Sequence, residues 1–138
     1  MAADYPHHHR VPTRWNDNDV FGHLNNTVYY VVMDTVITGW LVERGGLAVV
    51  DPVVRPVVAS SSCEYRRSGA YPDALDVGLR AAEVGTTSVT WELGLFRERD
   101  GALLAEGRWT HVFLDPGTSR PAPLPAPLRA AVEEELAR

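Results

Sequence analysis

The chain has 138 residues, 45% of them hydrophobic and 22% charged, and a formal net charge of -5 at pH 7. This length and composition predict one globular domain over residues 1–138 that buries its own core. The negative charge disfavours general binding to nucleic acid, no apolar run reaches the roughly 18–20 residues of a membrane-spanning helix, and a single cysteine excludes an intrachain disulfide.

The first residues do not have the pattern of a secretory signal. They contain acid and histidine side chains where a signal peptide has basic residues followed by an apolar core, so we expect a cytoplasmic protein. We also expect residues 1–9 to be flexible. The adjacent His7, His8 and His9 are of a type that binds metal ions, but such a run in a flexible terminus does not predict a defined metal site.

Residues 14–26 form a strongly polar stretch, with two aspartates and four asparagines. Directly after it, apolar residues recur at spacings of three and four, which predicts a helix with one broad apolar stripe. The stripe consists of Tyr29, Val32, Met33, Val36, Ile37, Trp40 and Leu41. Val28 and Val31 widen it, so we expect little of this helix to face water.

The ends of this helix have typical boundary residues. Asn25 or Asn26 is the expected cap, because a side-chain amide oxygen can accept a hydrogen bond from the first free backbone N–H groups. The pair Gly45 and Gly46 is the expected end, since helices commonly stop at glycine. The many apolar positions of this predicted helix indicate that a sheet surrounds it.

After the helix the pattern changes to the two-residue alternation of β-strands. Strands are expected at residues 57–67, 74–84, 88–96 and 103–114. Asp100 and Gly101 suit a tight turn between the last two. The predicted inward positions are Leu75, Val77, Leu79, Ala81, Val89, Trp91, Leu93, Leu95, Ala105, Gly107, Trp109, His111 and Phe113. Thr90, Glu92 and Gly94 are expected to face outward.

The C-terminal part begins with five prolines in residues 116–127, which predict a stiff, extended connector. Leu128, Val132 and Leu136 then define a short amphipathic helix with glutamates on its other face. A strand, a long helix, four antiparallel strands and a short terminal helix form an α+β pattern.

This order of elements resembles the 4-hydroxybenzoyl-CoA thioesterase family of the hot-dog fold, which includes acyl-CoA thioesterases. The most specific feature is the string Asp-x-Asp-x-x-Gly-His-x-Asn-Asn at residues 17–26, which runs into the helix that carries Tyr29. The segment at residues 85–88, Gly-Thr-Thr-Ser, also fits. The resemblance implies an antiparallel sheet wrapped around one long central helix.

The resemblance places the catalytic carboxylate at Asp19, the second aspartate of the loop. It acts there either as the base that activates water or as the nucleophile that forms an acyl-enzyme anhydride. The resemblance also places the backbone N–H of Asn26 at the oxyanion, where the unpaired amides and the dipole of a helix N-terminus favour negative charge. Gly22 lets the loop turn sharply.

Neighbouring polar residues have alternative roles. Asp17 is expected to organise the loop. His23 either polarises the substrate carbonyl as part of the catalytic group or only hydrogen-bonds the loop. Asp34 is either a second site residue or a polar contact at the surface, and Cys63 is expected to be a small buried residue.

The turn between the middle strands departs from the family pattern. In 4-hydroxybenzoyl-CoA thioesterase this turn carries basic residues for the CoA phosphates, whereas this chain has uncharged residues there. Arg66, Arg67, Arg97 or Arg99 are alternative phosphate ligands. The expected substrate-binding residues are Gly22, Asn25, Tyr29, Thr86, Thr87 and Ser88.

These features predict an acyl-CoA thioesterase that produces a carboxylic acid and free CoA without a metal or cofactor. One alternative is a hot-dog hydratase or dehydratase, in which Asp19 and His23 move a proton at carbon. Another is an acyl-binding protein without catalysis. The resemblance implies a homodimer or homotetramer, because a lone protomer leaves a sheet edge unpaired.

Overall fold

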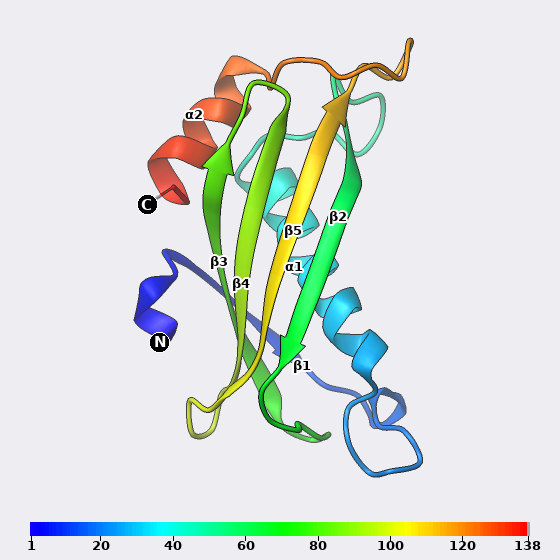
Figure 1. Cartoon of the computed structure of the whole chain (residues 1–138), viewed down its shortest axis with the longest axis vertical. Helices are drawn as coiled ribbons and strands as arrows, with labels where there is room; N and C mark the ends of the chain where they lie inside the picture. Colours follow the sequence, from blue (N-terminus) through cyan, green and yellow to red (C-terminus); the bar gives the residue numbers. More distant parts are fainter. Residues whose placement is uncertain (138) are drawn as a thin grey trace.

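The computed structural model describes residues 1–137 as one sheet with a long helix packed against it and a short C-terminal helix at one end (Figure 1). The strands are β1 (His7–Pro12), β2 (Arg55–Tyr65), β3 (Ala74–Val84), β4 (Ser88–Arg97) and β5 (Leu103–Leu114). They pair antiparallel in the order β1-β3-β4-β5-β2. The helices are α1 (Asn26–Glu43) and α2 (Ala126–Glu135), with short 3-10 helices η1 (Ala2–Asp4) and η2 (Trp15–Asp17) on either side of β1.

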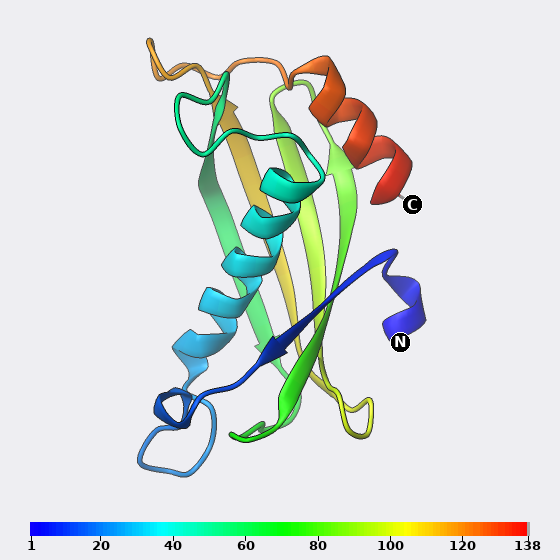
Figure 2. The same cartoon turned by 180° about the vertical axis from the view of Figure 1, so that it is seen from behind.

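The helix α1 lies across one face of the sheet (Figure 2). Its seven predicted stripe residues are all buried, and they form one core with the inward residues of β3, β4 and β5. Trp40 of α1 packs against Trp91 of β4, with ring centroids 6.0 Å apart. This is the predicted hot-dog fold, in which the sheet curves around a central helix.

The outer side of α1 differs from the prediction. Val31 is 63% exposed, and Thr35 and Thr38 are exposed on the same side of the helix. The sheet covers only one side of α1, so the prediction that little of this helix faces water is wrong for the isolated chain.

The N-terminal prediction is also wrong, because residues 7–9 belong to β1 rather than to a flexible segment. Tyr5 anchors this region: it is buried, and it packs against Phe96 with ring centroids 6.0 Å apart. Tyr5 lies on the outer face of the sheet over Gly78 and Gly94, where an added Cβ would come within 2.5 Å and 2.8 Å of its ring. Gly94 was expected to face outward, and it lies on that face, but Tyr5 covers it there.

The remaining boundaries agree closely with the alternation pattern. The bounds of β3 and β5 are as predicted, β4 is one residue longer, and β2 begins and ends two residues earlier than expected. The connector after β5 ends where α2 begins, and Leu128 and Val132 of α2 are buried against the core. No helix in residues 1–137 is long and apolar enough to cross a membrane.

Candidate active site

The polar loop joins β1 to α1, and the carboxylate of Asp17 holds its first turn together. This buried side chain accepts hydrogen bonds from the backbone N–H of Arg14 at 2.7 Å and from the Arg14 guanidinium at 2.9 Å and 3.2 Å. The hydrogen bond to Asp17 raises the pKa of Arg14 above its usual value. The carbonyl of Asp17 accepts the N–H of Asn25 at 2.9 Å, which fixes the loop to the start of the helix.

Asp19 occupies a tight turn further along the loop. Its backbone N–H donates to the carbonyl of His23 at 2.9 Å, its carbonyl accepts the N–H of Gly22 at 3.0 Å, and its Oδ1 accepts the N–H of Phe21 at 2.9 Å. Gly22 has a φ of 83°, a conformation that glycine adopts without steric cost. These contacts leave Oδ2 of Asp19 without a donor among residues 1–137.

A second segment, residues 69–71, holds the loop from the side. The Asn18 side chain accepts the N–H of Tyr71 at 2.9 Å, and the N–H of Leu24 donates to the carbonyl of Gly69 at 2.8 Å. The rings of Trp15 and Tyr71 meet edge to face, with centroids 6.1 Å apart. The position of Asp19 therefore depends on two parts of the chain that are far apart in the sequence.

The N-terminus of α1 is capped as predicted by Asn25. Its side-chain oxygen accepts the N–H of Thr27 at 3.0 Å, and its carbonyl accepts the N–H of Val28 at 2.9 Å. The N–H of Asn26 has no acceptor within the described chain. This amide is therefore available to a ligand at the positive end of the helix dipole.

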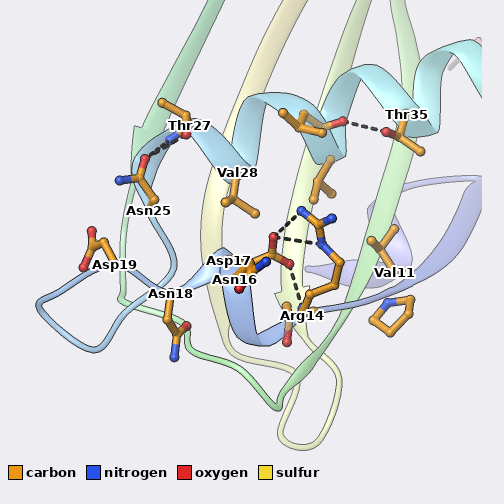
Figure 3. A pocket seen from close by; sticks show the side chains of 14 residues that line it. Val11, Arg14, Asn16, Asp17, Asn18, Asp19, Asn25, Thr27, Val28 and Thr35 are labelled. Atoms are coloured by element: carbon orange, nitrogen blue, oxygen red, sulfur yellow. Dashed lines mark hydrogen bonds and ion pairs between the residues drawn. The ribbon is translucent and has the colours of Figure 1, made fainter.

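A cavity of about 660 Å³ opens between the loop, the first turns of α1 and the end of β1 (Figure 3). Its polar part is lined by Arg14, Asp17, Asp19 and Asn25. The cavity continues along the helix, where Val11, Val28 and Thr35 line it. The site thus combines a carboxylate with a helix N-terminus at the entrance of a groove, an arrangement suited to acyl transfer.

The model of the thioesterase-like superfamily matches residues 13–132, which is most of the chain. The chain belongs to this superfamily. The chain is also similar to the uncharacterized protein YsmA of Bacillus subtilis, with 26% identity over 81 residues. This match covers 59% of this chain and 54% of YsmA, so the chain spans about half the length of that curated relative.

Solved structures of similar proteins agree with the fold of this thioesterase-like chain. The PA5185 protein of Pseudomonas aeruginosa is 41% identical with a TM-score of 0.94, and the alignment covers 98% of this chain and 94% of that one. The PA2801 protein of the same species, whose name assigns it provisionally to the thioesterases, is 30% identical with a TM-score of 0.86, covering 93% and 98%. The 1,4-dihydroxy-2-naphthoyl-CoA thioesterase Slr0204 of Synechocystis, at 17% identity and a TM-score of 0.83 over 92% and 95%, shares the fold.

Four expected site residues of the loop and the start of α1 do not line the cavity of Asp19: Gly22, His23, Asn26 and Tyr29. The side chain of His23 is exposed and does not line that cavity. Tyr29 is buried in the core on the other side of α1, against Tyr65 with ring centroids 5.2 Å apart. Burial raises the pKa of the Tyr29 hydroxyl. Asn26 and Tyr29 instead line a smaller hollow of about 220 Å³ together with Arg67.

The turn that carries Thr86, Thr87 and Ser88 lies at the end of the sheet near α2, opposite the loop of Asp19 (Figure 1). The carbonyl of Thr86 accepts the N–H of Leu124, and Arg129 of α2 donates to the same carbonyl at 3.4 Å. Within a single chain, these three residues therefore lie far from the candidate catalytic carboxylate.

The sequence patterns missed most of the residues that line the cavity, Arg14 and Thr35 among them. Arg14 precedes the recognised string, and its only sequence signal is the three-residue spacing to Asp17 that allows the side chains to meet. Thr35 lies on the exposed side of α1 and gives no hydrophobic signal. No group of three His, Cys, Asp or Glu residues in residues 1–137 is arranged to hold a metal ion.

Proposed function

We propose that this protein is an acyl-CoA thioesterase that hydrolyses a thioester to a carboxylic acid and free CoA. The observation that carries the proposal is the Asp19 carboxylate in a cavity that adjoins the N-terminus of α1. Membership of the thioesterase-like superfamily and the name of the PA2801 relative support the same reaction.

The proposed chemistry assigns separate tasks to the two parts of the site. Asp19 drives attack on the thioester carbon, either by taking a proton from water or by attacking the carbon itself. Both routes create a tetrahedral oxyanion at the positive end of the helix dipole. We assign its stabilisation to the free N–H of Asn26, whose two chain neighbours, Asn25 and Thr27, line the cavity of Asp19. The C–S bond then breaks, and the CoA thiolate leaves and takes up a proton. The route through an anhydride needs a second attack by water to release the acid and restore Asp19.

The geometry favours hydrolysis over the hydratase alternative. A proton transfer at carbon by an Asp and a His needs both side chains at one substrate. His23 contributes its carbonyl to the turn of Asp19, while its side chain is exposed outside the cavity. We therefore give His23 a structural role in the loop rather than a catalytic one.

We propose that the working protein is a homodimer or a homotetramer. β2 is an eleven-residue edge strand with mostly exposed side chains, and such an edge can pair with a second copy. Trp15 is 73% and Phe21 81% exposed beside the site, which fits a surface that another copy covers. Contacts from Thr86, Thr87 and Ser88 to the CoA part of a substrate at Asp19 would have to come from such a copy.

The test is release of free thiol from a panel of acyl-CoAs by the wild type and two matched loop variants. Asp19→Asn keeps the shape of the side chain but removes its basicity, so kcat should fall by roughly 10²- to 10⁴-fold or more. Asp17→Asn removes a carboxylate that binds Arg14, so this variant should lose thermal stability or raise KM more than it lowers kcat.

The two variants separate catalysis from loop structure. Equal and mild effects on kcat would show that Asp19 is not the catalytic carboxylate, and Asp34 would be the next candidate. Full activity of Asp19→Asn would remove the proposed mechanism. Absence of thiol release from every acyl-CoA in the wild type would refute the thioesterase function.

A further inference from the structure

The cavity of Asp19 continues as a groove between α1 and β1. Val11 of β1 lies on one side, and Val28, Val31 and Val32 of α1 lie on the other. Thr35 lies at the far end of this cavity, one turn beyond Val31, and its hydroxyl donates to the carbonyl of Val31 at 2.7 Å. The groove therefore leads away from the candidate catalytic carboxylate along the axis of the helix.

Past Thr35 the lining of the groove changes. A second hollow of about 140 Å³ begins there, and Thr35 lines both spaces. Three ionisable side chains enter its lining, His7 and His9 of β1 and Glu43 of α1. Val36, Gly39 and Trp40 of α1 complete it. The apolar section of the groove is thus bounded by Asp19 at one end and by ionisable side chains beyond Thr35 at the other.

The side chains of the apolar section are aliphatic. Among residues 1–137, no aromatic side chain lines the 660 Å³ cavity, whose apolar walls are Val11, Pro12, Val28, Val31 and Val32. Aromatic pockets commonly offer ring faces and edges to a bound ring, whereas branched aliphatic walls suit a flexible hydrocarbon chain through area burial alone. Arg14 also lines this space, but its charge is offset by Asp17 at 2.9 Å.

We propose that the acyl group of the substrate is a linear aliphatic chain that lies in this groove, with its thioester at Asp19 and its methyl end at Thr35. The inference rests on the proposed thioesterase activity and specifies its substrate class. Thr35 is then the residue that determines the preferred chain length.

The length of the groove follows from helix geometry. Thr27 is the first residue of α1 that lines the groove, and Thr35 is the last. Thr35 comes eight residues after Thr27, and at 1.5 Å per residue this separation spans roughly 12 Å. A zigzag hydrocarbon chain advances about 1.3 Å per C–C bond of ~1.5 Å, so this span holds a chain of about ten carbon atoms. Each further methylene buried in the apolar section should raise kcat/KM about fourfold. Beyond Thr35 that gain should diminish, because the ionisable side chains of His7, His9 and Glu43 enter the lining beside Val36 and Trp40.

The experiment compares two threonine variants of the same helix. Thr35→Phe places a large side chain in the groove. Thr38→Phe is the matched control, because Thr38 is also an exposed threonine of α1 but lines neither hollow. Thiol release is measured with butyryl-, hexanoyl-, octanoyl-, decanoyl-, lauroyl-, palmitoyl- and benzoyl-CoA, and melting temperatures establish that both variants are folded.

The wild type should show kcat/KM values that rise with chain length to octanoyl- or decanoyl-CoA and then level off or fall. In Thr35→Phe, kcat/KM for decanoyl-CoA should fall roughly tenfold or more while that for butyryl-CoA changes little. In Thr38→Phe, the profile should match the wild type.

Some outcomes overturn the inference while leaving the thioesterase proposal intact. These are a preference of the wild type for benzoyl-CoA, and equal chain-length profiles for the two variants. If Thr35→Phe does not fold, Thr35→Leu provides the same comparison with a smaller obstruction. Absence of thiol release from all seven substrates would instead refute the proposed function itself.

Discussion

Gly107 of β5 allows α1 to pack closely on the sheet, and its replacement by alanine tests this packing. A Cβ at position 107 would lie 2.0 Å from the sulfur of Met33, whereas ordinary contact begins at 3.4 Å. The sulfur must therefore move by about 1.4 Å, the difference between these distances. Met33 is fully buried, so the movement displaces other core side chains.

Overpacking of this kind typically costs about 1–3 kcal/mol. For a chain of this size each kcal/mol corresponds to about 3–4 °C in melting temperature, so Gly107→Ala should lower Tm by roughly 3–12 °C. A decrease in Tm is informative, because a strand normally gains stability when glycine is replaced by alanine. The measurement is thermal unfolding followed by circular dichroism, with urea unfolding as a second probe.

The matched control is Gly39→Ala in α1. An added Cβ there has open space around it, and the helix gains about 0.5–1 kcal/mol when glycine becomes alanine. The control should therefore raise Tm by roughly 2–4 °C. Adding Met33→Ala to Gly107→Ala should reduce the cost of the glycine substitution, since the obstruction is gone. A Gly107→Ala protein as stable as the wild type would refute this account of the helix packing.

Two further predictions concern pH and assembly. Burial lowers the pKa of His111 and of His7 below 6.5, and Asp34 partly opposes the shift at His111. As the pH falls through this range, the unfolded chain therefore binds more protons than the folded chain. The contribution of these two histidines to the free energy of unfolding should therefore be fully present above about pH 6.5 and decrease below it. Tm should be lower at pH 5 than at pH 7.5, and a higher Tm at pH 5 would contradict this prediction. For assembly, light scattering at micromolar concentration should give a mass of at least twice 15.2 kDa, and Lys substitutions at exposed, outward positions of β2 should reduce it. A species of 15.2 kDa alone would rule out the oligomer.

The periodic patterns of the sequence determined the main elements of the fold. The seven apolar positions predicted for the long helix are the seven buried residues of α1, because the same spacing of three and four both defines the stripe and faces the sheet. The bounds of β3 and β5 follow from two-residue alternation for the same reason. The polar string also fixed the capping residue of α1, since Asn25 is a local signal that needs no tertiary contact.

Local patterns gave no information about contacts between distant segments. Tyr5 looked like part of a flexible terminus, and only the space above Gly78 and Gly94 on the folded sheet gives it a buried place. Likewise the loop of Asp19 is held by Tyr71 and Gly69, whose approach depends on how the sheet brings the two loops together.

The candidate site shows the same division. Asp19 and its neighbours along the loop could be recognised from the sequence, because their residue types and spacing are local properties. The direction of the groove, its aliphatic walls and its boundary at Thr35 required the structure, because β1 and α1 contribute to them jointly. The separation of Thr86 from Asp19 was equally invisible in the sequence, since it depends on which end of a strand faces which end of a helix. Side-chain periodicity determines which face of an element is buried, but only the tertiary arrangement determines what that face meets.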